Sequence, residues 1–149
     1  MKLTAVLSTA AIAVVALGVT AVLAASNPIA ERQELMKHNG HEAKLGAAMA
    51  KGEKPFDLAA AKKIFATFEE AAQKMPGLFP PDSKTGHKTT AAPKIWEDMA
   101  DFKARLKKLG ADAKAARASV TGLTSFRTAF GGIGKQCGGC HHEYRIKRD

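Results

Sequence analysis

The residues best suited to chemistry lie near the C-terminus, in the run Cys137-Gly138-Gly139-Cys140-His141. This C-x-x-C-H spacing is the pattern of covalent haem attachment. The thiols of Cys137 and Cys140 can form thioethers with the vinyl groups of a haem, and the imidazole of His141 can then bind the iron from one side. Residues three and four apart share one face of a helix, so the three side chains would point the same way. The pattern predicts one haem c whose iron is bound by His141.

Three other uses of a C-x-x-C pair agree less well with this sequence. A thioredoxin-like motif follows a strand, and no strand-like run precedes Cys137. A zinc site usually needs a second pair of Cys or His ligands, and Cys137 and Cys140 are the only cysteines in the sequence. A disulfide between them would leave the adjacent His141 unexplained.

The first 25 residues resemble a secretory signal peptide, with Lys2 followed by an almost entirely apolar run to Ala25. The alternative is an uncleaved membrane anchor, because the run is long enough to span a bilayer. Cleavage would leave residues 26–149 as one domain with one core. Export agrees with the motif, since haem c is attached outside the cytoplasm. We expect a periplasmic protein with no membrane anchor.

The 149-residue chain is basic, with a formal net charge of +9, or +8 without Lys2. The lysines are spread over all the predicted helices, as on solvated helix faces, and do not form one block. Export argues against nucleic acid as a partner. A basic surface then favours docking to redox partner proteins that carry acidic surfaces.

Four helical segments can be predicted after the signal. Asn27 can cap a helix that opens with Pro28, Asp57 and Thr121 can cap two others, and Pro93 can open the third. A loop rich in Pro and Gly spans residues 76–92. The predicted helices cover residues 28–51, 58–75, 93–118 and 122–147.

The apolar residues of these segments recur at spacings of three and four, which marks one buried face per helix. Four such helices joined mostly by short links predict an all-α protein, an antiparallel four-helix bundle. The spacing in the second helix is typical, and it runs through Leu58, Ala61, Phe65, Phe68, Ala72 and Met75. In the C-terminal helix, Cys137 and Cys140 fall on the buried face, so a haem attached there would point between the helices.

Glycines crowd the C-terminal helix near the motif. Each costs about 1 kcal/mol relative to alanine in a helix interior, so propensity alone would not keep this segment helical. We expect the attached haem to hold it, and the glycines to leave room for the ring. The haem-free protein would then be loosely folded in this region. The glycines concerned are Gly131, Gly132, Gly134, Gly138 and Gly139.

A second axial ligand would have to come from upstream, because the eight residues after His141 contain no methionine. Met36 is one candidate, since its helix face continues through small residues from Gly40 to Ala50 that would let a flat ring approach. The alternative is an ordinary core methionine. Bulky neighbours make Met75 and Met99 core residues, and Met49 lies off the small face. Surface positions are expected for His38, His41 and His142, and His87 lies in the predicted loop.

Beyond the C-x-x-C-H motif, several stretches resemble the class II c-type cytochromes, the family of cytochrome c′ and cytochrome c-556. The resemblance covers the chain after the signal. It is strongest in the stretches 32–40, 48–55, 78–80, 93–96 and 140–145, which read RQELMKHNG, AMAKGEKP, LFP, PKIW and CHHEYR. It implies a four-helix bundle with covalently bound haem on the C-terminal helix, and a basic residue near the haem at Arg145.

The resemblance also addresses the position of Met36. In cytochromes c′ this position is typically apolar, and the iron is five-coordinate and binds NO or CO. In the c-556 branch it is a methionine that binds the iron, which gives a low-spin electron carrier. The resemblance therefore implies a non-enzymatic, mono-haem electron-transfer protein with His141 and Met36 as axial ligands. The alternative is a gas-binding protein of the cytochrome c′ type. A homodimer is common in that branch, so a second copy of the chain is a candidate partner.

Overall fold

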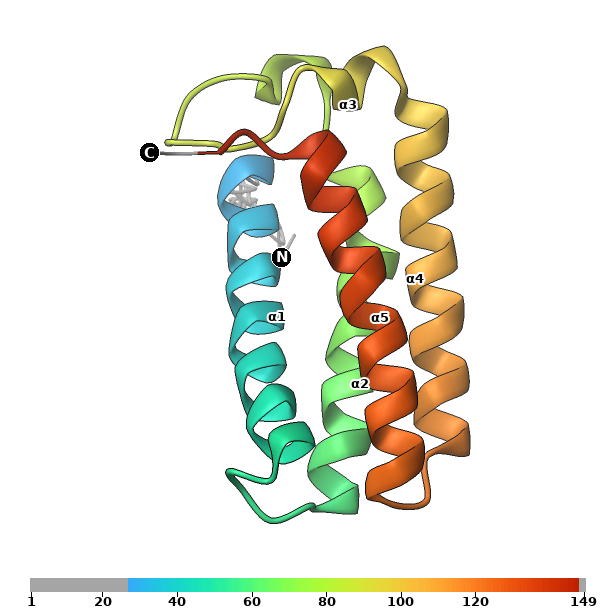
Figure 1. Cartoon of the computed structure of the whole chain (residues 1–149). Helices are drawn as coiled ribbons and strands as arrows, with labels where there is room; N and C mark the ends of the chain where they lie inside the picture. Colours follow the sequence, from blue (N-terminus) through green and yellow to red (C-terminus); the bar gives the residue numbers. More distant parts are fainter. Residues whose placement is uncertain (1–26, 148–149) are drawn as a thin grey trace, which may run out of the picture.

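A computed structural model describes residues 27–147. Four long helices lie side by side and alternate in direction (Figure 1), so the predicted antiparallel four-helix bundle is confirmed. The long helices are α1 (Pro28–Lys51), α2 (Leu58–Lys74), α4 (Met99–Ser119) and α5 (Leu123–Tyr144). Three short elements, η1 (Met75–Gly77), η2 (Pro81–Ser83) and α3 (Lys94–Glu97), lie in the connection between α2 and α4. The predicted signal peptide, residues 1–25, lies outside the described residues.

Local capping explains where α1 and α2 begin. The Asn27 side chain accepts hydrogen bonds from the backbone N–H groups of Ile29 and Ala30, and Pro28 opens the helix. Asp57 Oδ1 accepts from the N–H of Ala60 over 2.6 Å. Gly52 ends α1 in the left-handed conformation, with φ of 82°, which a residue with a Cβ would adopt at a cost. Both predicted starts are confirmed.

The third predicted helix is divided in the structure. Asp98 leaves helical geometry with φ of −130° and ψ of 58°, and its carboxylate accepts from the N–H of Asp101 over 3.2 Å. Asp98 therefore caps α4, and only the four residues of α3 precede it. Gly110 does not interrupt α4, which continues to Ser119.

The C-terminal helix differs from its prediction at both ends. Thr121 does not cap it, because Ser125 Oγ accepts from the N–H groups of Thr121 and Gly122 instead. The helix ends at Tyr144, three residues before the predicted Lys147. After Tyr144 the chain pairs with the loop before α3, where Ile146 N–H donates to Thr90 O over 2.8 Å and Ala92 N–H donates to Tyr144 O over 3.0 Å.

The core has two clusters of buried side chains. One is centred on Phe65 and Phe126, which are fully buried with ring centroids 5.6 Å apart. The other contains Phe79, Phe102 and Tyr144, whose rings meet edge to face. Leu58 is 38% exposed, so it does not belong to the buried face predicted for its helix. Within residues 27–147, no helix is long and apolar enough to cross a membrane.

Candidate functional site

A cavity of about 980 Å³ opens among α1, α2, α4, α5 and the loop before α3. Its walls contain Cys137, Cys140 and His141 of α5, together with Met36 of α1 and Arg145. These are the residues that the sequence selected for chemistry, drawn from opposite ends of the chain. The fold therefore places all of them around one space.

On α5, helical spacing places the three residues of the C-x-x-C-H motif on the side that faces the cavity. Both thiols are free and half-buried. Burial raises the pKa of Cys137 and of Cys140, although the charge of Arg105 partly opposes the shift at Cys140. Desolvation, and then the charge of Arg145, lowers the pKa of His141. A neutral imidazole is the form that binds a metal.

Met36 is half-buried on the cavity side of α1. Met49 is 2% exposed in the core cluster around Phe65 and does not line the cavity. Met99 packs against the other cluster without lining the cavity. Met75 touches the cavity but is 3% exposed among aromatic and aliphatic neighbours. Met36 is therefore the methionine on α1 that the structure brings to the cavity.

The remaining histidines lie on the surface, as predicted for His38, His41 and His142. His38 is 3.3 Å from Glu34, and His142 is 3.9 Å from Glu143. The backbone carbonyl of His87 accepts from Gln33 Nε2 over 2.9 Å. His41 is exposed on α1. These four histidines do not line the cavity.

Two features of the cavity wall were missed by sequence reasoning. Arg32 is 4% exposed, and its guanidinium is hydrogen-bonded to the loop 78–89; burial lowers its pKa. Tyr144 donates to Asp101 Oδ2 over 2.6 Å, and Arg105 Nε donates to the same oxygen. The position of Arg32, four residues before Met36, could have indicated that it lines the same cavity, because residues four apart share one helix face.

The cavity has the chemistry that a haem requires. Free thiols stand in its wall beside an imidazole, and much of the remaining wall is apolar. The Oδ1 atom of Asn39, another wall residue, is buried without a hydrogen-bond partner in the structure. A buried polar atom of this kind commonly meets a ligand or water. The residues present therefore fit the group that the motif predicts.

The glycines of α5 serve the cavity only in part. Gly134 and Gly139 line it, and a Cβ built at Gly134 would meet no atom within 4 Å. Gly131, Gly132 and Gly138 are exposed and lie outside the cavity wall. The expectation that all five glycines make room for the ring is therefore wrong for these three.

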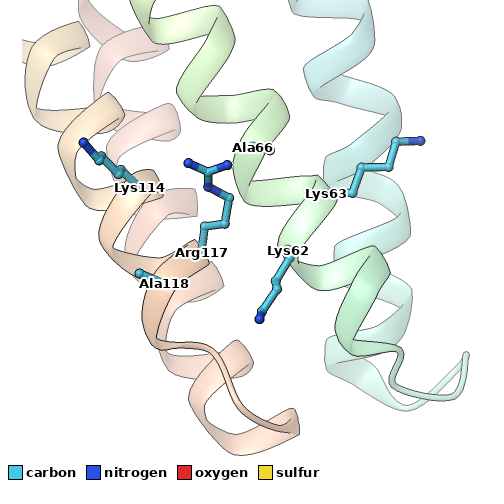
Figure 2. A pocket seen from close by; sticks show the side chains of 6 residues that line it. All are labelled: Lys62, Lys63, Ala66, Lys114, Arg117 and Ala118. Carbon is cyan, nitrogen blue, oxygen red and sulfur yellow. The ribbon is translucent and has the colours of Figure 1, made fainter.

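A second, more open cavity of about 540 Å³ lies between α2 and α4 (Figure 2). Arg117 there is 3.0 Å from Glu69, and Lys63 is 3.6 Å from Glu42. The wall has no thiol, thioether or imidazole, so it offers no iron ligand. It is formed by Lys62, Lys63, Ala66, Lys114, Arg117 and Ala118. In the described part of the chain, no three His, Cys, Asp or Glu side chains gather to hold a metal ion directly.

Comparison with known proteins agrees with this geometry. The family model described as Cytochrome C′ matches residues 27–145. The chain is 41% identical to a cytochrome c′ of Rhodopseudomonas palustris over 90% of its own length and 92% of that protein. It is 42% identical to a cytochrome c-556 of Agrobacterium fabrum, over 83% and 84% of the two chains.

Solved structures show the same fold. Cytochrome c′ from Rhodopseudomonas palustris superposes with a TM-score of 0.80 at 41% identity, over 83% of this chain and 99% of that one. A structure of oxidised cytochrome c556 from the same organism gives 0.75 at 32% identity, over 83% and 98%. Similarity at this level extends to both branches of one family.

Proposed function

The chain belongs to the cytochrome c′ family of class II c-type cytochromes, and we propose that it is a periplasmic electron carrier with His141 and Met36 as axial iron ligands. Proteins of this family carry one covalent haem c, which supplies a one-electron Fe(III)/Fe(II) couple. In this chain, Cys137 and Cys140 would form the two thioethers. The cavity wall would bury the ring away from bulk water.

The position of Met36 is the observation that carries this proposal. Met36 lies on α1, while Cys137, Cys140 and His141 lie on α5, and all four line the same cavity. An iron held by His141 would therefore have a thioether among the groups of the surrounding wall. A methionine ligand favours the reduced state and raises the reduction potential. Because neither ligand need leave during electron transfer, the protein would reorganise little.

A second candidate is a gas-binding protein with a five-coordinate iron. The 41% identity to a cytochrome c′ favours it as much as the 42% identity to a cytochrome c-556 favours the electron carrier. In this alternative, Met36 would be only part of the cavity wall. NO or CO would then bind on the side of the iron opposite His141.

The substitution Met36→Ala distinguishes the two candidates. We expect the variant to convert from low-spin to high-spin iron and to bind CO, because alanine removes the thioether. Met99→Ala is the matched control, since Met99 packs against the aromatic cluster and does not line the cavity. The measurement is the visible spectrum of the haem-loaded proteins with and without CO. An unchanged low-spin spectrum in Met36→Ala would remove Met36 from the iron.

Export and partners belong to the same proposal. A cleaved signal at residues 1–25 would release the domain 26–149 into the periplasm, and mass spectrometry of the mature protein measures the cleavage site. Partners would be redox proteins, with a second copy of the chain as a further candidate and with no role for nucleic acid. We expect electron transfer without enzymatic turnover.

A further inference from the structure

Besides its packing against α2, α1 makes two contacts that lie on either side of Met36 along the helix. The first, which we call the N-terminal support, is the contact of Arg32 with the loop 78–89. Its Nη1 donates to Leu78 O and Ser83 Oγ, both over 2.9 Å. Its Nη2 donates to Ser83 O and Thr89 Oγ1, both over 2.8 Å.

This support is rigid for two reasons. The guanidinium lies over the ring of Phe79, 4.6 Å from its centroid. Ser83 is 3% exposed, and its hydroxyl also donates to Pro80 O over 2.9 Å. A planar guanidinium with this many fixed acceptors has few other orientations available.

The second contact, the C-terminal support, lies about four turns further along α1. A Cβ built on Gly46 would be 2.4 Å from Cε2 of Phe130 and 2.8 Å from its Cζ. The ring edge therefore rests directly on the backbone of α1. Phe130 is stacked on Phe126 with centroids 5.2 Å apart, which limits how far its ring can move away from α1. Close by, Arg127 Nε donates to Ala50 O over 2.7 Å.

Between the two supports, α1 borders the cavity. Met36, Asn39, Gly40 and Ala43 all line it. A Cβ built on Gly40 would meet no atom within 4 Å. At Gly40 this part of α1 faces open space on the cavity side. Met36 packs against the cluster of Phe79 and Phe102, and Glu42 holds the opposite side of the helix 3.6 Å from Lys63 of α2. The two supports add direct contacts to the loop 78–89 and to α5 on either side of this stretch.

We propose that Arg32 and the Gly46–Phe130 contact are positioning elements that set whether Met36 reaches the iron. This inference rests on the proposed function, in which Met36 is an axial ligand. Neither Ser83 nor Gly46 borders the cavity, so both supports can be altered without changing a side chain that would touch the haem.

Helix geometry ranks the two supports. At about 1.5 Å per residue, Met36 lies about 6 Å from Arg32 and about 15 Å from Gly46. If α1 pivots as a rigid rod about one support, a 1 Å shift at Gly46 moves Met36 by about 0.3 Å, whereas a 1 Å shift at Arg32 moves it by about 0.7 Å. The N-terminal support therefore controls Met36 more strongly.

The test uses one variant at each support, in haem-loaded protein. Ser83→Ala removes one acceptor of Arg32, and Ser119→Ala is its control, since Ser119 Oγ bonds only the backbone of its own helix at Ala115. Gly46→Ala places a Cβ 2.4 Å from Cε2 of Phe130. Because non-bonded carbons prefer a separation of about 3.5–4.0 Å, α1 and the Phe130 ring must move apart. Its control is Gly131→Ala on α5, where a Cβ meets no atom within 4 Å.

The readouts are the low-spin fraction of the iron, the NMR signal of an iron-bound methionine methyl, and CO affinity. Urea unfolding checks that each variant is folded. We expect Ser83→Ala to lower the ratio of Met-bound to Met-free iron by about threefold to tenfold, the equivalent of one hydrogen bond. Gly46→Ala should lower this ratio by a smaller factor. The control variants should match wild type.

The outcomes of these measurements separate the inference from the proposed function. If wild type shows a bound methionine and both support variants match their controls, the inference is overturned while the proposed function stands. If Gly46→Ala acts more strongly than Ser83→Ala, the rigid-rod account is wrong. If wild type shows no bound methionine, the proposed function fails first. Should Gly46→Ala not accept haem, Arg127→Ala tests the same support.

Discussion

The hydrogen bond between Tyr144 and Asp101 joins α5 to α4 beside the cavity. The Tyr144 hydroxyl donates to Asp101 Oδ2 over 2.6 Å, and Arg105 Nε donates to the same oxygen over 2.6 Å. Tyr144 is 4% exposed. Tyr144→Phe removes the hydroxyl and keeps the ring, whose centroid is 5.2 Å from that of Phe102. The substitution therefore tests this bond with little change in packing.

The expected cost follows from the surroundings of the bond. A hydrogen bond to a charged group contributes about 1.5–3 kcal/mol. The side chain of Asp101 is 42% exposed, and Arg105 remains bound to it in the variant. Solvent screening at such a site weakens the interaction. We therefore expect Tyr144→Phe to lower the free energy of unfolding at pH 7 by about 1–1.5 kcal/mol.

The same bond predicts the pH dependence. The hydrogen bonds from Tyr144 and Arg105 lower the pKa of Asp101 in the folded protein. The stabilisation by the ionised Asp101 is therefore complete above the ordinary aspartate pKa, and it is lost as the pH falls through the lowered pKa of the folded state. Burial, followed by the bond to Asp101, raises the pKa of Tyr144 to about 12. That contribution is complete below the ordinary tyrosine pKa of about 10 and is lost as pH rises toward about 12.

Urea unfolding of the haem-loaded proteins at a series of pH values measures the effect. The difference between wild type and Tyr144→Phe should be constant from about pH 5 to 9 and shrink at both extremes. Asp101→Asn and the double variant complete a mutant cycle that isolates the pair. A loss below about 0.5 kcal/mol at pH 7, or one that persists undiminished in acid, would refute the reasoning.

Three further predictions concern stability. Phe65→Ala should cost about 3–5 kcal/mol, because Phe65 is fully buried, and a urea midpoint close to that of wild type would contradict its place in the core. Gly131→Ala should raise the thermal midpoint, since it gains up to about 1 kcal/mol of helix propensity at a position where a Cβ meets no atom within 4 Å; a lower midpoint would count against this. Haem-free protein should lose circular dichroism from the glycine-rich α5, and native helicity with cooperative melting would disprove that expectation.

The features that sequence predicted best are those encoded by neighbouring residues. Asn27 with Pro28, and Asp57, start their helices through bonds to atoms two or three residues away. The bundle followed in the same way, because apolar spacing marks one buried face per helix. Asp98 also caps its helix through a neighbouring residue, Asp101. The apolar spacing continues on both sides of Asp98, so the sequence did not indicate the break between α3 and α4.

The features that sequence missed depend on contacts between distant segments. α5 ends at Tyr144 because residues 144–146 pair with residues 90–92. The residues next to Tyr144 in the sequence give no signal of this pairing. Arg32 is buried through bonds to residues 46 to 57 positions away. Its charge would have assigned it to the surface.

The candidate site shows the same division. Cys137, Cys140 and His141 form a local motif, so the sequence alone is enough to predict their chemistry. That Met36 faces their cavity depends on how α1 packs. The small residues along α1 indicated the face, and the resemblance to the c-556 branch indicated the residue. The Tyr144–Asp101–Arg105 network had no comparable signal, since its members come from α4 and α5.

The axial ligation of the iron is the central claim, and spectroscopy of the wild-type protein tests it most directly. The measurement is the visible and EPR spectrum of the haem-loaded protein, oxidised and reduced, with and without CO. The account predicts low-spin spectra that do not respond to CO, because His141 and Met36 occupy both axial positions. High-spin spectra that shift when CO is added would contradict it, and would make the protein a gas-binding cytochrome c′.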